Sequence, residues 1–559
     1  MRVLSLEQKM DLRKNSNGKI SAMEDEFKSW ENTFKLISKY VVPSRGRYKG
    51  DRTNDGKRRD IYQIDGTSWQ AARTMASGMQ GGLTSPGRPW FKLGVPKDRE
   101  LAKYKPINIW LQDLADLFYS IFNISNVYSA FYNVYEECGS FATSAMFVGE
   151  DLENIIMART FTAGEFSISL DRRLMPNSFH LQNDWTVSQL VNEFGLENLS
   201  NSTKSLYNTN KTEEYVKVNW LIEPNNDRQL DLKDNTNMKF RSLWWEEGSN
   251  NTDLLRFSGF RNFPMMVPRW GTISNDAYGN GCPGIMSLGA AKMLQKLNEK
   301  GLIGLDKMID PPMVGSGLSR RNKTSLIPGA VTIIDSNAGV FQPAYQINLA
   351  FQDLEYKADQ VRRYIKECYF NDLFMMLAMQ NGKYMTATEV AERHEEKLIM
   401  LGPVLDRLYF ELLNPTIDRV FDICQELNIL PPPPPEMVDM DIDIEYTSVL
   451  AQAQKMIGTK SLEQFVAFGG SLIEPFPTIA DNMNTDEIIR IYAKWLGVPA
   501  EVINDEDTVE AIRQSRQAKE NMAMNAEVGL QAAQGAKLMS ETDTTKDSAL
   551  TALMGGISK

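Results

Sequence analysis

Two long helical segments flanking a short insert constrain the fold of this 559-residue chain more than any other feature. The first, residues 283–310, begins at a proline, which is favoured in the first turn of a helix, and ends before the pair Pro311-Pro312. The second runs from about 349 to 369. The insert between them, 311–348, contains the extended runs AVTIID and GVFQ, which predict a β-hairpin.

The second helical segment carries a heptad repeat. Its apolar residues recur at alternating spacings of three and four, which is the pattern of a seam for a neighbouring helix. Three heptads are too few for a free-standing coiled coil, so we expect this seam to pack within an assembly. The seam residues are Phe351, Leu354, Ala358, Val361, Ile365 and Cys368.

The part of the chain before these helices is predicted to combine helices with a β-rich subdomain. Apolar spacing predicts helices over 1–40, 66–82 and about 107–122, and alternation of period two predicts strands from 147 to about 270. The stretch LTSPGRPWFKL that follows the second helix reads as a glycine-proline turn and a short strand. Its Trp-Phe pair needs a core or a neighbouring subunit to cover it.

The part after the helix pair is predicted to be mainly helical. A capping box of Thr386 and Glu389 begins a third long helix, which Gly402-Pro403 and Asn414-Pro415 interrupt before it ends near Leu427. Five consecutive prolines then form a stiff spacer, followed by an amphipathic strand and an acidic helical region. From about Thr508 we expect a helix that becomes a flexible tail after Ser540.

Charge and cysteine content exclude several classes of protein. The net charge of −11 lies almost entirely between 436 and 510, with 15 acidic and 4 basic residues, so the rest of the chain is neutral and tight, static binding to DNA is not expected. The basic stretch 45–60 is interpreted as a solvated loop because aspartates are interspersed. Four separated cysteines favour a reducing compartment. We find no signal peptide and no apolar run of membrane-spanning length.

No arrangement of residues predicts an enzyme, a metal site or a cofactor. The two histidines, His180 and His394, cannot form a two-histidine metal motif, and no phosphate-binding or dinucleotide-binding glycine motif is present. An acidic ladder alternates with apolar residues, which predicts a strand with its acids facing water rather than an EF-hand. Its members are Asp439, Asp441, Asp443 and Glu445.

The segment 371–386 leaves two interpretations open. Its methionines, which include Met375 and Met376, suit either a hydrophobic core segment or an adaptable contact loop. The Asn381-Gly382 turn followed by a lysine favours a loop tip that faces solvent.

Taken together, these segments resemble the head-to-tail connector, or portal, proteins of short-tailed bacteriophages (podoviruses, T7-like). The most specific part is GTSWQAARTMASGMQGGLTSPGRPWFKL, reinforced by YFNDLFMML and by MTATEVAERHEEKLIMLGPVLDRLYFELLNP. The order of segments also agrees over nearly the whole chain. The resemblance implies an α+β, mainly helical portal-protein fold assembled as a ring, usually of twelve subunits.

The resemblance also assigns names to the segments. It implies a wing (1–280, with the β-rich subdomain 147–270), stem helix one (283–310), a clip (311–348), stem helix two (349–370), a tunnel loop (371–386), a long kinked wing helix (387–430), the polyproline spacer (431–435), a crown with a possible barrel helix (436–540) and a flexible tail (541–559).

Residue roles follow from the same resemblance. The tunnel loop would face DNA, and the clip would contact an adaptor or the terminase. The heptad seam would join neighbouring subunits of the stem. The tunnel-loop residues are Lys383, Asn381, Met379 and Met385, and the clip residues are Arg320, Arg321 and Lys323.

The implied function is that of a non-catalytic channel at the unique capsid vertex, made and assembled in the host cytoplasm. The ring would nucleate procapsid assembly and conduct double-stranded DNA during packaging and ejection. Implied partners are the terminase large subunit, tail adaptor or nozzle proteins, the major capsid protein, and scaffold or internal core proteins, with no membrane and no cofactor. The alternatives are another structural virion protein, such as a capsid or tail-tube component, and a nucleic-acid enzyme.

Overall fold

The computed structural model divides into two compact units, Met1–Ser471 and Leu472–Lys559, which are described separately below. The described residues are 6–48, 51, 63–95, 105–229, 234–250, 253–316, 327, 330–334, 342–343, 350–378, 399–437, 442–452, 465–468, 470–471, 484–496, 504 and 506–541.

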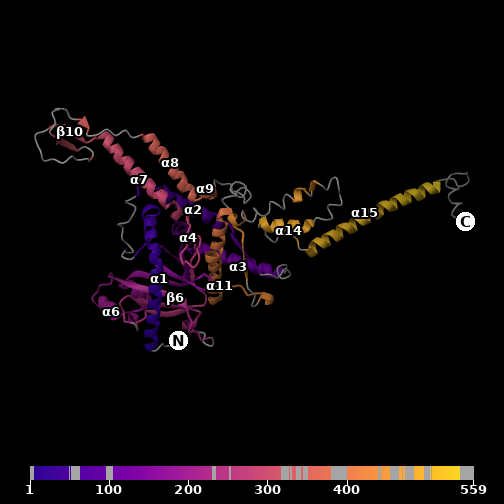
Figure 1. Cartoon of the computed structure of the whole chain (residues 1–559). Helices are drawn as coiled ribbons and strands as arrows, with labels where there is room; N and C mark the ends of the chain where they lie inside the picture. Colours follow the sequence, from indigo (N-terminus) through magenta and orange to yellow (C-terminus); the bar gives the residue numbers. More distant parts are fainter. Residues whose placement is uncertain are drawn as a thin grey trace. The chain divides into compact units, whose positions relative to one another are not determined.

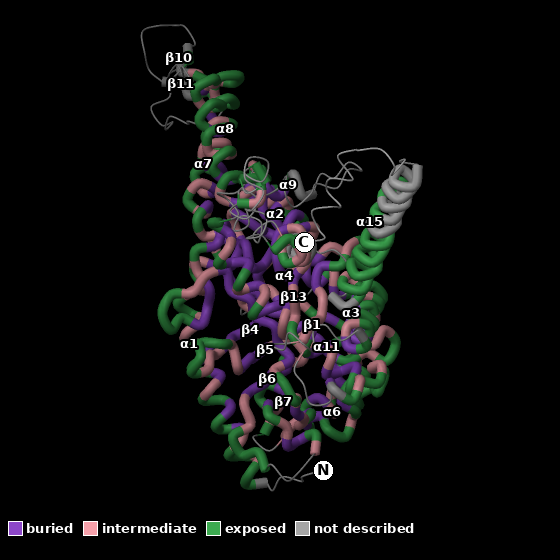
Figure 2. Tube along the Cα trace, turned by 90° about the vertical axis from the view of Figure 1, so that its right-hand side faces the viewer, coloured by how far each residue is buried: buried purple, intermediate pink, exposed green. Residues whose placement is uncertain are grey.

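Four helices form the N-terminal part of the first unit: α1 (Leu6–Tyr40), α2 (Thr67–Leu83), α3 (Lys105–Ile124) and α4 (Val127–Phe141). The helices predicted over 1–40, 66–82 and 107–122 are thereby confirmed. The helix α2 lies at the centre, where α4, α7, α8 and α9 pack on it, and Figure 2 shows it among buried segments. Its small residues, such as Ala72 and Ala76, are completely buried, because close helix packing leaves room for little more than a methyl group.

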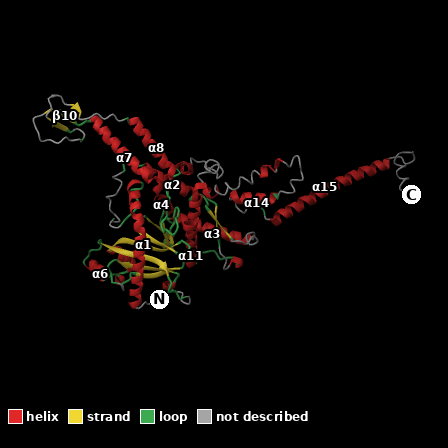
Figure 3. Cartoon of the chain, viewed as in Figure 1, coloured by secondary structure: helices red, strands yellow, loops and turns green. Residues whose placement is uncertain are grey.

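The β-rich subdomain is also confirmed, and Figure 3 shows its strands gathered beside α1. A three-stranded sheet has the order β3-β2-β9, and a five-stranded antiparallel sheet has the order β4-β5-β6-β7-β8. The strands are β2 (Ala145–Asp151), β3 (Ile155–Phe161), β4 (Phe166–Leu170), β5 (Pro176–Thr186), β6 (Tyr215–Pro224), β7 (Phe240–Glu246), β8 (Arg256–Phe260) and β9 (Met265–Met266). Inserted helices are α5 (Val187–Phe194), η3 (Leu196–Asn198), α6 (Asn201–Asn208) and η4 (Asn235–Asn237).

The LTSPGRPWFKL stretch is part of the core. Its strand, β1 (Phe91–Gly94), pairs antiparallel with β13 (Asp443–Tyr446), the described part of the strand predicted after the prolines. Trp90 and Phe91 are 1% and 0% exposed, so the core of the same chain covers them and no neighbouring subunit is required. The prolines lead into the short helix η6 (Pro435–Met437).

The helix pair is confirmed as α7 (Pro283–Ile309) and α8 (Phe351–Cys368), which lie side by side in Figure 1. The hairpin prediction for the insert is wrong. Strand β10 (Met313–Ser316) lies between β11 (Val331–Ile334), to which it is parallel, and β12 (Gln342–Pro343), to which it is antiparallel. The apolar pattern of the sequence indicates which residues form β11 and β12, but it does not indicate that β10 lies between these two strands in the sheet.

The segment predicted as a loop begins as a helix, α9 (Asn371–Ala378), and the loop prediction is wrong for these residues. Leu373 and Phe374 are 0% exposed, so the alternative of a core segment holds here. Apolar spacing over so short a run does not separate a helix from a loop. Residues 379–398, which include the predicted capping box and His394, lie outside the described residues.

The third long helix is confirmed from residue 399 onward, but it is not a uniform α-helix. Residues 399–408 are helical, η5 (Tyr409–Leu413) is a π-helical segment, and α11 (Asn414–Glu426) follows. The π-helix ends where the sequence predicts an interruption at Asn414-Pro415, because Pro415 has no N–H to donate to the preceding turn.

The second unit contains α14 (Thr485–Leu496) and α15 (Glu506–Glu541), which confirms the helix expected from about 508. The Arg513 guanidinium donates two hydrogen bonds of 2.6 Å to the Asp486 carboxylate and thereby ties the two helices together. Among the described helices of both units, none is long and apolar enough to cross a membrane.

Candidate functional site

The candidate site is the helix pair α7–α8, which carries the small sheet of β10 at its far end (Figure 1). The start of α7 is anchored to the end of α4. Cys282 caps the helix, since its Sγ accepts from Ile285 N at 3.4 Å and its thiol donates to the Ser140 carbonyl at 3.2 Å. A Cβ at Gly284 would lie 2.8 Å from Ser140 Cα, so only glycine permits this approach.

A buried glutamine joins α7 to the segment that precedes α2. The Gln295 Oε1 accepts hydrogen bonds from Ile64 N at 2.7 Å and Asp65 N at 3.0 Å. Its Nε2 donates to the Asp65 carbonyl at 2.5 Å. The Gln295 amide therefore binds the backbone of this segment through both its nitrogen and its oxygen.

The Asp65 carboxylate then connects three helices. It accepts from Thr67 N at the start of α2 (2.9 Å), from Asn298 Nδ2 of α7 (3.1 Å) and from Arg362 Nε of α8 (2.9 Å). Burial acts to raise the pKa of Asp65, but the hydrogen bonds from Thr67 and Arg362 outweigh it and the pKa is lowered. We call Asp65, Gln295, Asn298 and Arg362 the base of the helix pair.

Replacing Asp65 by asparagine is expected to lower the free energy of unfolding of the first unit by about 1–3 kcal/mol, because a hydrogen bond to a charged partner is lost. A carboxylate whose folded pKa is lowered stabilises the fold above its unfolded pKa of 3.8 and loses that contribution only as the pH falls through the folded value. The difference between wild type and variant, measured by urea denaturation, should therefore be equal at pH 7 and pH 5. A difference that disappears at pH 5 would contradict this assignment.

The heptad seam already has a partner within the chain. Its face packs on α7 and α2, and Ala358 and Ile365 belong to the main hydrophobic core. The other seam residues are half-buried: Phe351, Leu354, Val361 and Cys368. The seam thus forms an intrachain contact, and its role between subunits stays a prediction.

The opposite sides of both helices expose apolar and aromatic side chains. On α7, Met286 and Met293 are 57% and 43% exposed, seven residues apart and hence on one face. On α8, Tyr356 and Tyr364 are 61% and 50% exposed. The far end of α7 also exposes Leu302, Leu305, Met308 and Ile309, but Leu302 and Ile309 lie on the other side of the helix from the two methionines. Exposed apolar residues that share one face of a helix mark interaction surfaces, and we call Met286, Met293, Tyr356 and Tyr364 the outer face of the helix pair.

Several predicted site residues lie outside the described residues. They are the tunnel-loop residues Lys383, Asn381, Met379 and Met385, the clip residues Arg320, Arg321 and Lys323, and the acidic-ladder residues Asp439 and Asp441. The base of the helix pair was not predicted. The only sequence signal for it is an aspartate just before a helix, whereas nothing local marks Gln295 or Arg362 as its partners.

The interpretation of 45–60 as a solvated loop is wrong for its first arginines, while residues 49–50 and 52–60 lie outside the described residues. Arg45 binds the Glu136 carboxylate at 2.5 Å, and Arg47 lies 3.3 Å from Glu165. Glu136 and its neighbour Glu137 are both buried at the end of α4. Acidic partners that lie far along the chain explain why the sequence did not reveal this pairing.

Stability should depend on pH through Glu137. Burial, partly offset by Arg45, raises its pKa from 4.5 to about 7. Because the folded state then holds the proton more tightly, this group makes stability fall as pH rises from about 4.5 to 7. Glu137→Gln should remove that slope, so its stability relative to wild type should grow across this window. Urea midpoints at pH 5 and pH 8 measure the effect, and a constant difference would contradict the prediction.

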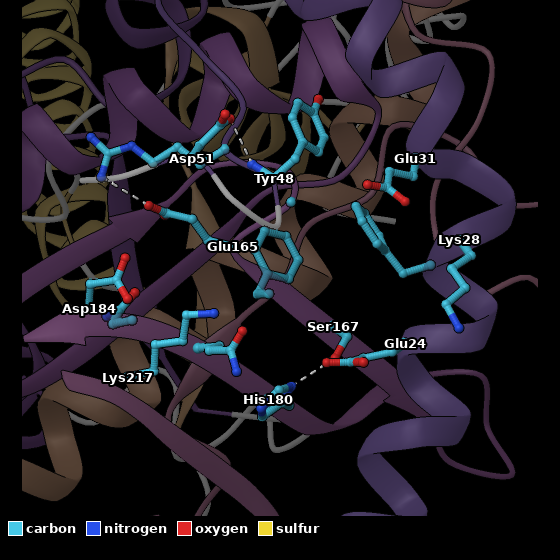
Figure 4. A pocket seen from close by; sticks show the side chains of 16 residues that line it. Glu24, Lys28, Glu31, Tyr48, Asp51, Glu165, Ser167, His180, Asp184 and Lys217 are labelled. Carbon is cyan, nitrogen blue, oxygen red and sulfur yellow. Dashed lines mark hydrogen bonds and ion pairs between the residues drawn. The ribbon is translucent and has the colours of Figure 1, made fainter. Parts of the chain in front are cut away.

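A pocket of about 130 Å³ lies between α1 and strands β4 and β5 (Figure 4). At its floor, His180 Nδ1 lies 3.3 Å from Ser167 Oγ and Nε2 lies 3.0 Å from Asn219 Oδ1. All three side chains are buried, and an amide stands where a catalytic triad has its carboxylate. We therefore assign His180 a structural role. Within the described part of the chain, no group of three His, Cys, Asp or Glu could hold a metal ion.

Comparisons with known proteins agree over nearly the whole sequence. A family model described as the bacteriophage head to tail connecting protein matches residues 13–503. The chain is 39% identical over 536 residues to the portal protein of Salmonella phage epsilon15, with 96% of each chain covered. It is 37% identical over 533 residues to the probable portal protein of Bordetella phage BPP-1, with 95% of each covered.

A solved structure, the virion of a native gene transfer agent particle, is matched over 78% of this chain and 90% of that one. An identity of 11% and a TM-score of 0.30 are too low to indicate a shared fold.

The chain belongs to the bacteriophage head to tail connecting protein family. Its role is that of a phage portal, the connector between head and tail, and the resemblance to head-to-tail connector, or portal, proteins inferred from the sequence is confirmed. The alternatives of a capsid or tail-tube protein and of a nucleic-acid enzyme are not favoured.

Proposed function

We propose that this chain assembles into a closed ring, a dodecamer, at the unique vertex of the capsid. The observation that carries the proposal is the outer face of the helix pair, whose methionines and tyrosines are 43% to 61% exposed. Exposed methionines on α7 and tyrosines on α8 form two different surfaces. A head-to-tail contact between different surfaces closes into a ring when the rotation from one subunit to the next divides a full turn.

In this proposal the segments keep the roles that the family resemblance implies. Residues 283–310 and 349–370 are the stem, 311–348 the clip, 371–386 the tunnel loop, and 436–540 the crown. The base of the helix pair holds the stem on the wing, 1–280, through Asp65 and Gln295. The presence of α9 would shorten the loop to the residues that follow Ala378.

The channel would conduct double-stranded DNA without holding it. Phosphate contacts by many lysines and arginines bind tightly and with strong dependence on salt, which a conduit must avoid. The acidic excess of residues 436–510, within the proposed crown, suits a repulsive wall there, and Lys383 would be one of a few positive charges that centre the duplex. The ring would also nucleate procapsid assembly in the host cytoplasm with capsid and scaffold or internal core proteins. It would dock first the terminase large subunit and later the tail adaptor proteins.

The test is the mass and shape of the purified protein. Twelve copies of the 63.3 kDa chain give a closed ring of about 760 kDa, which mass photometry and negative-stain images detect together. A monomer or dimer at every protein and salt concentration would refute the proposal.

The outer face should determine assembly. Met293→Asp is expected to reduce the fraction of rings by at least about tenfold, because a charge would be buried without a partner between subunits. Leu152→Asp is the matched control, since Leu152 is fully exposed on the turn between β2 and β3 and should leave ring formation unchanged. Both variants should keep the circular dichroism spectrum of wild type. Normal rings from Met293→Asp would show that the outer face is not an interface.

A further inference from the structure

The junction between α8 and α9 combines three unfavourable local features. Phe370 has φ of +52°, a left-handed conformation that bulky residues rarely adopt. Its carbonyl accepts the first hydrogen bond of α9, from Phe374 N at 3.1 Å, so α9 begins at a residue with no side-chain oxygen to cap it. The next residue, Asn371, is buried, and its Oδ1 accepts no hydrogen bond from the described residues.

Packing of α9 against α2 offsets the unfavourable features at its first residues. The side chains of Leu373 and Phe374 are completely buried, and α9 packs on α2. The Phe374 backbone approaches α2 so closely that a Cβ at Gly78 would lie 2.8 Å from Phe374 Cα and 2.7 Å from its Cδ1. In Figure 1, α9 lies at the end of α8 and close to α2.

We propose that α9 is a docked helix poised to detach from α2, with Phe370 as its hinge and the Gly78–Phe374 contact as its lock. The strain at the hinge favours release, and burial of Leu373 and Phe374 favours docking. Because the strain and the burial both act on this one short helix, α9 opens while α2 and α8 remain folded. The inference concerns α9 itself and does not depend on the proposed function.

The lock is tested by Gly78→Ala, with Gly289→Ala as its matched control. Both glycines are inside helices, where alanine is intrinsically favoured. A Cβ at Gly289 meets nothing within 4 Å, whereas a Cβ at Gly78 collides with the backbone of Phe374. In the full-length protein, hydrogen exchange of the amides of 371–378 should accelerate by about tenfold or more in Gly78→Ala and stay unchanged in Gly289→Ala.

The hinge is tested by comparing Phe370→Gly with Phe370→Ala, which remove the same ring. Only alanine retains the penalty for positive φ, so the amides of 371–378 should exchange at least about fivefold faster in the alanine variant. Equal exchange in these two variants would refute the hinge, and unchanged exchange in Gly78→Ala would refute the lock. Should Gly78→Ala fail to fold, the Phe370 pair still decides. Acceleration that spreads equally over α7 and α11 would show general destabilisation and would overturn the proposal.

Discussion

Glu411→Gln should be among the most destabilising single changes in the first unit, with a loss of about 3–5 kcal/mol in the free energy of unfolding. Glu411 lies in the π-helical segment, and its carboxylate accepts from Arg269 N at 2.9 Å and from Arg269 Nη2 at 2.7 Å. The two side chains are 4% and 2% exposed. Removing the carboxylate charge leaves the Arg269 guanidinium buried without its counter-ion.

A second variant separates the ion pair from the packing around it. Replacing both partners, Arg269→Met with Glu411→Leu, should recover part of the lost stability, because no unpaired charge is then buried, although the backbone N–H of residue 269 loses its acceptor. Glu193→Gln is the control, since its ion pair with Arg256 is about half exposed and should contribute less than about 1 kcal/mol. Urea denaturation at neutral pH measures all three. If Glu411→Gln costs no more than Glu193→Gln, the buried pair does not stabilise the fold as inferred.

The other large effect is expected for Trp90→Ala, which should cost about 3–5 kcal/mol, as truncation of buried aromatic residues does. The Trp90 ring stacks on Phe122 and Tyr446 with centroid distances of 5.9 and 6.3 Å. Its backbone N–H donates to the Tyr119 hydroxyl at 3.0 Å, and its carbonyl accepts from Thr447 N at 2.9 Å. Truncation would therefore leave a cavity between α3 and the β1–β13 pair.

The half-buried Trp69 on α2 provides the matched comparison. Trp69→Ala removes the same side chain where solvent can fill the space, so we expect a cost below about 2 kcal/mol. Shifts in urea midpoint compare the two variants directly. Equal shifts for the two variants would mean that the rings packed around Trp90 do not increase its contribution to the free energy of unfolding.

Local patterns predicted most of the helices of the first unit but not the partners of each segment. Apolar spacing was sufficient for α1, α2, α3, α7 and α8, because long amphipathic helices carry several turns of the same signal. It gave no prediction for α4, although that helix has 15 residues, and it failed at α9 and at the order of β10, β11 and β12, which are short. Of the candidate site, the seam on α8 was predicted and the base of the helix pair was not.

The sequence by itself determined the family, the positions of the long helices and the β-rich subdomain, since each of these depends on residues close together in the chain. Only the tertiary structure decided which residues meet. Asp65 binds Arg362, Trp90 stacks on Tyr446, and Arg269 is neutralised by Glu411 across separations of 142 to 356 residues. A buried charge or ring is stabilised by whatever the fold brings against it, and no local pattern contains that information.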